Sequence, residues 1–365
     1  MTEARDIAGF ALPFTAGALL ASMVPYDGIC RLSCLAGTFL ILTAALVSSR
    51  LFLDQRRFLQ MSAIGITALC TGILANCAAS ACSISSLERI TGIRAVASQF
   101  KEGIVTVIDS LNFQEKDTGA LLKALLTGDR TSLSHEVTQA FRKSGAAHIL
   151  ALSGMHLGII YGILVWILRG AGNTPAIKRL RSIILICACG FYTLATGAGE
   201  SITRAFLFIL LNEIAGLTHR ETGLRHTMMA ALIIQIAIDP TSVSSVGFQL
   251  SYAAIAGIAF IHPHLKGFWP YEGDRKGLMG RIWETASMSI SCQMTTAPLA
   301  WYYFGSIPSN FLITNLIAIP LTTLIIPLSL ICVILQAAGI CPQIMTDITA
   351  NLTTLMTGLC AALSA

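Results

Sequence analysis

The sequence predicts an all-α, polytopic membrane protein with about 11 transmembrane helices. Amphipathic extracytoplasmic helices are expected between the third and fourth spans. The first observation is composition: 54% of the residues are hydrophobic and only 12% are charged, whereas soluble domains carry about 25% charged residues. The second is the mean hydropathy of +0.71. The third is the length of the apolar runs, many near the ~20 residues that cross a hydrocarbon core as a helix.

The apolar runs follow one another along most of the chain, with one long interruption. Pro320 and Pro327 fall inside the tenth run, where prolines often mark a kink or a re-entrant break. Prolines are tolerated there when neighbouring groups satisfy the freed carbonyls. The predicted spans are 7–24, 29–48, 58–79, 148–168, 182–197, 201–217, 226–238, 246–261, 284–303, 311–337 and 343–363.

Basic residues in the loops give the expected orientation. The loops at 49–57, 169–181, 218–226 and 262–281 contain Lys and Arg, and all four fall on one side of the predicted topology. The connections at 25–28, 239–245 and 306–310 contain neither residue. Because cytoplasmic loops carry an excess of Lys and Arg, the N-terminus is expected inside and the C-terminus outside.

Residues 82–147 form the one long segment without a predicted span. Its apolar residues recur at helical spacing, with charged residues such as Lys101 and Asp109 opposite them. Two or three amphipathic helices, on the membrane surface or on the helix bundle, fit this pattern. Ser134 is a candidate helix N-cap. We therefore divide the chain into a three-span segment (1–81), this extracytoplasmic helical segment (82–147) and a channel core (148–365).

The stretch HILALSGMH, at 148–156, places ionisable groups where the fourth span begins. Such groups inside a span indicate a functional site. On a continuous helix with about 100° per residue, His148, Ser153 and His156 share one sector. They could bond neighbouring helices, line a hydrated path or bind a metal ion. Small residues let helices approach closely, so a packing face is expected at Gly154, Gly158 and Gly162.

Polar residues also enter other predicted spans. Glu200 and Arg204 are four residues apart and can pair, and Gln249 lies in the eighth span. The eleven cysteines are mostly in apolar runs without metal-site spacing, and His135-Glu136 is not followed by the second histidine of a zinc H-E-x-x-H motif. No nucleophile elbow, P-loop or dinucleotide motif is present. We expect no enzymatic activity, no metal and no cofactor.

Five motifs in order resemble the membrane core of the ComEC family, the competence proteins that form a channel for DNA uptake. Together they extend from about residue 121 to residue 321. They read LLTGDRTSLS, FRKSGAAHILALSGMHLGI, GAGESITRAFLF, DPTSVSSVGFQLSYAAIAGI and TTAPLAWYYFGSIPSNFLITNLIAIPL. By motif match, the resemblance points to a DNA path or pore lined by Asp129, Arg130, His148, Ser153, His156, Arg204 and Gln249.

The resemblance implies a channel that carries single-stranded DNA across the bacterial inner membrane during natural transformation. The partners it implies are the single strand, a cytoplasmic helicase-like motor or DNA-binding protein, a separate DNA receptor and nuclease, and the lipid bilayer. Longer family members also have an OB-like and a metallo-β-lactamase-like domain. Neither is expected here, as in a natural short form or a shortened version of a longer protein.

Two other functions stay open from the sequence. A transporter for a small anion or metabolite would explain the same polar residues, the prolines in the tenth run and a Glu200–Arg204 pair. An intramembrane hydrolase would use Ser153 with a histidine, or zinc on His148 and His156. Groups more than about 4 Å apart would count against this hydrolase.

Overall fold

A computed structural model of the 365-residue chain describes residues 91–111, 113, 115–172, 174–218, 223–268 and 277–364. Near the N-terminus it describes residues 11, 13–19, 66 and 68–73. All regular structure in these ranges is helical, with no strand, which confirms the all-α prediction for them. The expected spans at 7–24, 29–48 and 58–79 lie largely outside these ranges, and the total of about 11 spans stays a prediction.

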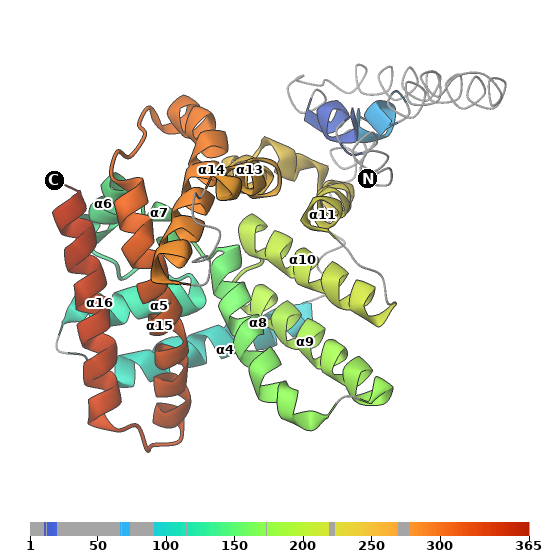
Figure 1. The fold of residues 1–365 in the computed structure, drawn as a ribbon. Helices are drawn as coiled ribbons and strands as arrows, with labels where there is room; N and C mark the ends of the chain where they lie inside the picture. Colours follow the sequence, from blue (N-terminus) through green and yellow to red (C-terminus); the bar gives the residue numbers. More distant parts are fainter. Residues whose placement is uncertain are drawn as a thin grey trace, which may run out of the picture. The chain divides into compact units, whose positions relative to one another are not determined.

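The elements after residue 90 follow one another with short connections (Figure 1). Two short non-α segments, a 3₁₀-helix at Pro240–Ser244 and a π-helix at Gly257–Ile261, flank α12. The α-helices are α4 (Thr91–Ser110), α5 (Lys116–Thr127), α6 (His135–Ser144), α7 (Ala147–Leu150), α8 (Gly154–Leu168), α9 (Pro175–Ala195), α10 (Glu200–Leu217), α11 (Leu224–Ile238), α12 (Val246–Ala256), α13 (His262–Gly267), α14 (Leu278–Phe304), α15 (Phe311–Ala337) and α16 (Gln343–Leu363).

The chain forms two compact units. One contains residues 1–89 and 218–252, and the other contains residues 90–217 and 253–365. In the first, the Tyr252 hydroxyl on α12 donates to Oε1 of Gln235 on α11 at 3.1 Å. The second unit contains most of the predicted site. The three-segment division of the chain is a separate description and stays a prediction.

The core of the second unit lies where α5 packs among α6, α7, α15 and α16. Leu121, Leu122 and Leu125 of α5 are at most 1% exposed, and Ile325 and Ile326 of α15 are fully buried with them. The helices of 82–147 are expected either on the membrane surface or on the helix bundle. Of these helices, α5 packs on the bundle. In Figure 1, α15 and α16 lie side by side in red, with α5 beside them in cyan.

A second group of helices in this unit consists of α8, α9 and α10. Leu157, Cys189 and Ile202, one from each helix, are at most 1% exposed and form its small core. The predicted runs from 148 onward all contain helices at these positions. The prediction that the fourth run is one helix from residue 148 is wrong, because α7 ends at Leu150 and α8 begins at Gly154.

Two helical segments in the described residues are long and apolar enough to cross a membrane. They are the continuous run Val246–Gly267 and α15, Phe311–Ala337. The helices Gly154–Leu168 and Leu224–Ile238 are apolar but shorter. Pro320 and Pro327 lie inside α15, which is continuous rather than broken.

Candidate functional site

The break between α7 and α8 brings the polar residues of the fourth predicted span together. Ser153 has extended backbone dihedrals (φ −119°, ψ 170°) and precedes the first residue of α8. Serine favours this N-cap position because its short side chain bonds the exposed end of a helix. The prediction that His148, Ser153 and His156 share one sector of a continuous helix is therefore wrong. The three residues lie near one another because the backbone turns between α7 and α8.

Ser153 and His156 form a reciprocal contact at the start of α8. The Ser153 backbone N–H donates to Nδ1 of His156 at 3.2 Å, and the Ser153 hydroxyl lies 3.0 Å from the same nitrogen. A nitrogen that accepts from an N–H carries no proton, so the proton of the neutral ring is on Nε2. His156 is fully buried, and its Nε2 has no hydrogen-bond partner among the residues that the structure describes.

His148 lies on α7, close enough to His156 for an electrostatic interaction between the two rings. Its Nδ1 is 3.2 Å from the carbonyl of Gly145, which ends α6. Gly145 has a φ of +89°, and a β-carbon there would lie 2.9 Å from Cβ of Phe311 and 3.0 Å from its Cα. Only glycine fits this turn, which packs against Phe311 at the start of α15.

The loop 128–134, which connects α5 to α6, packs against the same break. Gly128 has a φ of +75°, and a β-carbon there would lie 2.5 Å from Cδ1 of Leu152. Oδ1 of Asp129 accepts the Thr131 hydroxyl at 2.7 Å and the Thr131 N–H at 3.0 Å. These two bonds lower the pKa of the Asp129 carboxyl. Asp129 thus shapes the loop, whereas Arg130 is exposed.

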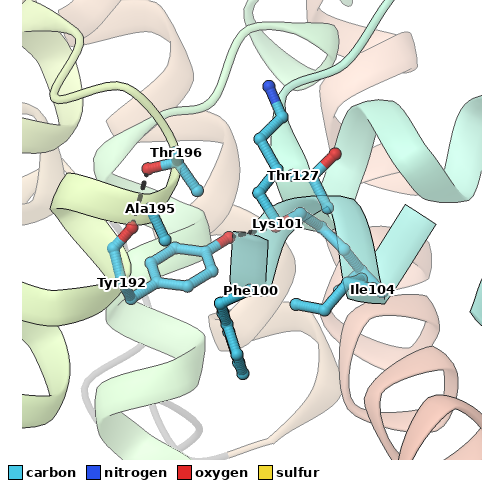
Figure 2. Close-up of a pocket in the computed structure, with 8 residues that line it drawn as sticks. Phe100, Lys101, Ile104, Thr127, Tyr192, Ala195 and Thr196 are labelled. Atoms are coloured by element: carbon cyan, nitrogen blue, oxygen red, sulfur yellow. Dashed lines mark hydrogen bonds between the residues drawn. The ribbon is translucent and has the colours of Figure 1, made fainter. Parts of the chain in front are cut away.

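A small pocket is lined by α4, by the end of α5 and by the end of α9. Figure 2 shows the Tyr192 ring between Thr196 and Lys101, with the Lys101 ammonium directed away from the ring of Phe100. The Tyr192 hydroxyl donates to the carbonyl of Leu126 at 2.7 Å. This bond links α9 to α5 next to the 128–134 loop, so the pocket marks a meeting point of segments distant in sequence.

Arg204 lies in α10 and is only 6% exposed. Its Nη2 donates to Oγ of Ser201 at 3.2 Å. The neighbouring residue, Ala205, approaches α8, because a β-carbon on Gly154 would lie 3.2 Å from the Ala205 Cβ. This places Arg204 on the helix that packs against the first turn of α8.

The expected packing face on α8 is limited to its first turn. A β-carbon on Gly158 or Gly162 would meet no atom within 4 Å in the described part of the chain, and both residues are exposed. The close approach therefore involves Gly154 and does not continue along the helix. Beyond this turn, α8 packs in the α8–α10 core through Leu157, Tyr161 and Leu164 rather than through its glycines.

Gln249 belongs to the other compact unit. Its Nε2 donates to the carbonyl of Val243 at 3.0 Å, across the turn that starts α12. Of the seven predicted path residues, Asp129, Arg130, His148, Ser153, His156 and Arg204 share one unit, and Gln249 is described separately. In the ranges described, no group of three His, Cys, Asp or Glu side chains could hold a metal ion.

The structure also shows a polar cluster that sequence reasoning missed. Glu213 on α10 accepts the Tyr161 hydroxyl of α8 on Oε1 and the Ser182 hydroxyl of α9 on Oε2, each at 2.5 Å. One carboxylate therefore joins three helices. The signal available in the sequence was an acidic residue inside the run FLFILLNEIAGL, since ionisable residues in apolar spans mark sites or partners.

Sequence comparison with known proteins places the chain in a family. The profile of the competence protein family matches residues 125–365. The chain is 25% identical over 218 residues to ComE operon protein 3 of Bacillus subtilis, covering 60% of this chain and 26% of that protein. It is 27% identical over 207 residues to competence protein ComA of Neisseria gonorrhoeae, covering 55% and 28%.

A third relative, YcaI of Escherichia coli, is 25% identical over 225 residues, with 60% of this chain and 29% of that protein covered. The chain thus spans less than a third of the length of each of these relatives. No solved structure matches significantly. The matched region begins at Leu125, in the last turn of α5, and includes the 128–134 loop, the α7–α8 break and Arg204. On this match over most of its length, the chain belongs to the competence protein family, as its resemblance to ComEC proteins predicts.

Proposed function

We propose that this protein takes up DNA in natural transformation, as a channel that carries single-stranded DNA across the inner membrane into the cytoplasm. The family match over residues 125–365 carries the proposal. The clustering of motif residues around the α7–α8 break supports it. Under this proposal, the N-terminus is inside, the C-terminus is outside, and the chain works as a channel rather than as an enzyme.

The chemistry of the site suits a weak and transient contact with a strand. Single strands are usually held by cations and aromatic stacking. Here Arg130 is exposed and His148 offers an imidazole, whereas His156 and Arg204 are buried. A sparse set of contacts favours passage, because strong binding would hold the strand in the channel.

Directional force must then come from outside the channel. No nucleotide-binding motif is present in the sequence. We propose that a cytoplasmic helicase-like motor or a DNA-binding protein pulls the strand, and that a separate receptor and nuclease deliver it. We propose no cofactor for the passage itself.

Uptake of labelled DNA tests the proposal. Cells that depend on this protein should accumulate DNase-resistant single-stranded label, and cells without it should not. His148→Ala and Arg130→Ala should reduce accumulation while protein levels in the membrane stay normal. His264→Ala removes an exposed histidine on α13, outside this cluster, and is the matched control. Normal uptake by both site variants would overturn the residue assignment, and normal uptake without the protein would overturn the function.

One observation favours a second function. The Ser153 hydroxyl lies 3.0 Å from Nδ1 of His156, within the reach that a serine nucleophile and its base require. A catalytic histidine usually has its other nitrogen oriented by a third group, and Nε2 of His156 has none in the described residues. A fluorophosphonate probe that labels Ser153 and spares Ser153→Ala would favour the hydrolase.

A further inference from the structure

The turn between α8 and α9 carries a concentrated positive charge. Arg169 follows α8, and Lys178, Arg179 and Arg181 lie in the first two turns of α9. The first three are exposed and Arg181 is partly exposed. Within the described ranges none of the four forms an ion pair, although Lys123 and Lys266 do. We call these four residues the basic turn.

This charge works against the helix that carries it. The N-terminal end of a helix has a partial positive charge and favours acidic residues, but the first turn of α9 contains none. Lys178 and Arg181 are also three residues apart, a spacing at which like charges repel. A local rule broken without an internal compensation is expected at functional sites.

The carboxylate of α10 that contacts both α8 and α9 already has hydrogen-bond partners. Glu213 accepts hydroxyl groups from Tyr161 and Ser182, and Ser182 directly follows Arg181. Arg181 lies close enough to Tyr161 for an electrostatic interaction. The compensation for the basic turn is therefore expected from an anion outside the described residues.

Large apolar side chains next to the basic turn indicate which anion. Trp166 is 73% exposed and Ile167 is 58% exposed at the end of α8. On α9, Leu180 and Ile183 are 58% and 54% exposed. A phospholipid matches both parts, with its phosphate at the cations and its acyl chains along these side chains. A nucleic acid needs cations with stacking aromatics; Trp166 is the one aromatic among these four side chains, and the three aliphatic ones favour acyl chains.

We propose that the basic turn binds the headgroups of anionic phospholipids, with Trp166, Ile167, Leu180 and Ile183 against the acyl chains. Clusters of Lys and Arg at the end of a membrane helix attract anionic lipids electrostatically, and tryptophan favours the level of the headgroups. The inference rests on the membrane location in the proposed function and does not depend on the passage of DNA.

Reconstituted protein tests the inference, because the basic residues should raise the Tm in anionic lipid and not in neutral lipid. The full chain is placed in nanodiscs of phosphatidylcholine alone or with about one third phosphatidylglycerol, and thermal unfolding is followed. We expect phosphatidylglycerol to raise the Tm of the wild type. The variant K178Q/R179Q/R181Q should lose this increase of roughly 2 °C or more. In phosphatidylcholine alone its Tm should equal or exceed that of the wild type, because the repulsion has gone.

Two further variants separate the alternatives. A176E keeps all four cations and adds an acid to the first turn of α9, so it should raise the Tm in phosphatidylcholine and weaken the response to phosphatidylglycerol. R142Q/K143Q removes exposed cations from the last turn of α6, where they suit the helix dipole, and should leave the response unchanged.

Three results would overturn the inference. One is a triple variant that responds to phosphatidylglycerol like the wild type. The second is a triple variant whose Tm falls by the same amount in both lipids, which indicates a fold defect. The third is a labelled oligonucleotide that binds the wild type in phosphatidylcholine and loses affinity in the triple variant, which assigns the basic turn to DNA. Failure of the protein to enter nanodiscs of either composition would instead contradict the proposed membrane location.

Discussion

The backbone N–H of Ser153 donates to Nδ1 of His156, three residues later, and the Ser153 hydroxyl contacts the same nitrogen. This geometry is that of a capping box, in which the N-cap and N3 residues satisfy each other. It gives both residues a structural task at the start of α8. The task is separate from any contact with DNA, so substitutions can distinguish the two.

Ser153→Ala should destabilise the protein by about 1 kcal/mol, the usual cost of losing a serine N-cap. Ser153→Asn keeps a capping side chain and should cost a few tenths of that. For the partner residue, His156→Gln keeps an acceptor at N3, whereas His156→Ala removes it and leaves a cavity. Thermal unfolding of the purified variants measures these differences.

DNA uptake by the same variants tests whether the His156 imidazole has a role beyond capping. If the ring of His156 acts only in capping, His156→Gln should take up DNA normally. If the ring is needed on the path, uptake should fall although the Tm is preserved. Equal stability of Ser153→Ala, Ser153→Asn and the wild type would contradict the capping role.

The helical content was predictable, whereas the site geometry was not. Long apolar runs reveal helices well, and α15 and α16 have the bounds expected from hydropathy. The break at Ser153 escaped prediction because the apolar pattern continues across it from Ile149 to Leu157. The chain turns there because of a cap and a tight contact between Gly128 and Leu152, and neither is a property of one segment.

Polar residues in the spans show a second limit of sequence reasoning. Thr322 and Ser329, both buried in α15, donate to the carbonyls of Ala318 and Ile325 in their own helix, each at 2.7 Å. Such hydroxyls need no cavity, because the preceding turn satisfies them. Glu213 is different, since its partners come from two other helices. A list of polar residues cannot separate these cases without the contacts between helices.

Three glycines with positive φ should tolerate alanine to different degrees. Gly339→Ala meets only backbone strain, because its φ is +71° and nothing lies within 4 Å; this costs on the order of 1–2 kcal/mol. Gly128→Ala should cost more, since it also displaces the flexible Leu152 side chain. Gly145→Ala should cost most, because it meets Cβ and Cα of Phe311, which no side-chain rotation can move away.

Unfolding midpoints of the three purified variants give this order. Leu152→Ala combined with Gly128→Ala provides the control, because removing the obstructing side chain should recover part of the loss. A cost for Gly145→Ala equal to that for Gly339→Ala would contradict the close packing of the α6–α7 turn on α15.

The Asp129 loop should respond to acid. Its folded-state pKa is lowered by the Thr131 hydroxyl and N–H, so the ionised carboxylate stabilises the fold above the unfolded-state pKa of about 3.9. This stabilisation is lost as the pH falls through the lower, folded-state pKa. Thr131→Val removes the hydroxyl and keeps the N–H. In this variant, the pKa of the Asp129 carboxyl should lie nearer its ordinary value.

Unfolding of the wild type and Thr131→Val between about pH 7 and pH 3 measures the effect. The difference in stability between them should be largest at neutral pH and shrink toward acid. Asp129→Asn is the reference without a titrating group, and in that background Thr131→Val should show no such dependence on pH. A difference that grows toward acid would contradict the assigned bonds.

The Glu213 cluster should behave as one cooperative unit. Tyr161→Phe or Ser182→Ala leaves the carboxylate with one hydroxyl partner, and each should cost about 1.5–3 kcal/mol, the range for hydrogen bonds to charged groups. With both hydroxyls gone, the carboxylate keeps no protein partner at these two positions. The double variant should therefore lose more than the sum of the single losses, by about 0.5–3 kcal/mol, the range found for residues in one network.

Repeating the cycle in a Glu213→Gln background assigns this coupling to the charge. Glutamine has a similar shape and can still bond either hydroxyl, but it carries no charge to leave uncompensated. Removing Tyr161 and Ser182 hydroxyls should then be close to additive. Cys187→Ser, an exposed position on α9, should not couple to Tyr161→Phe in either background. Additive losses in the presence of Glu213 would mean that the carboxylate contributes two independent bonds and that the cluster is not cooperative.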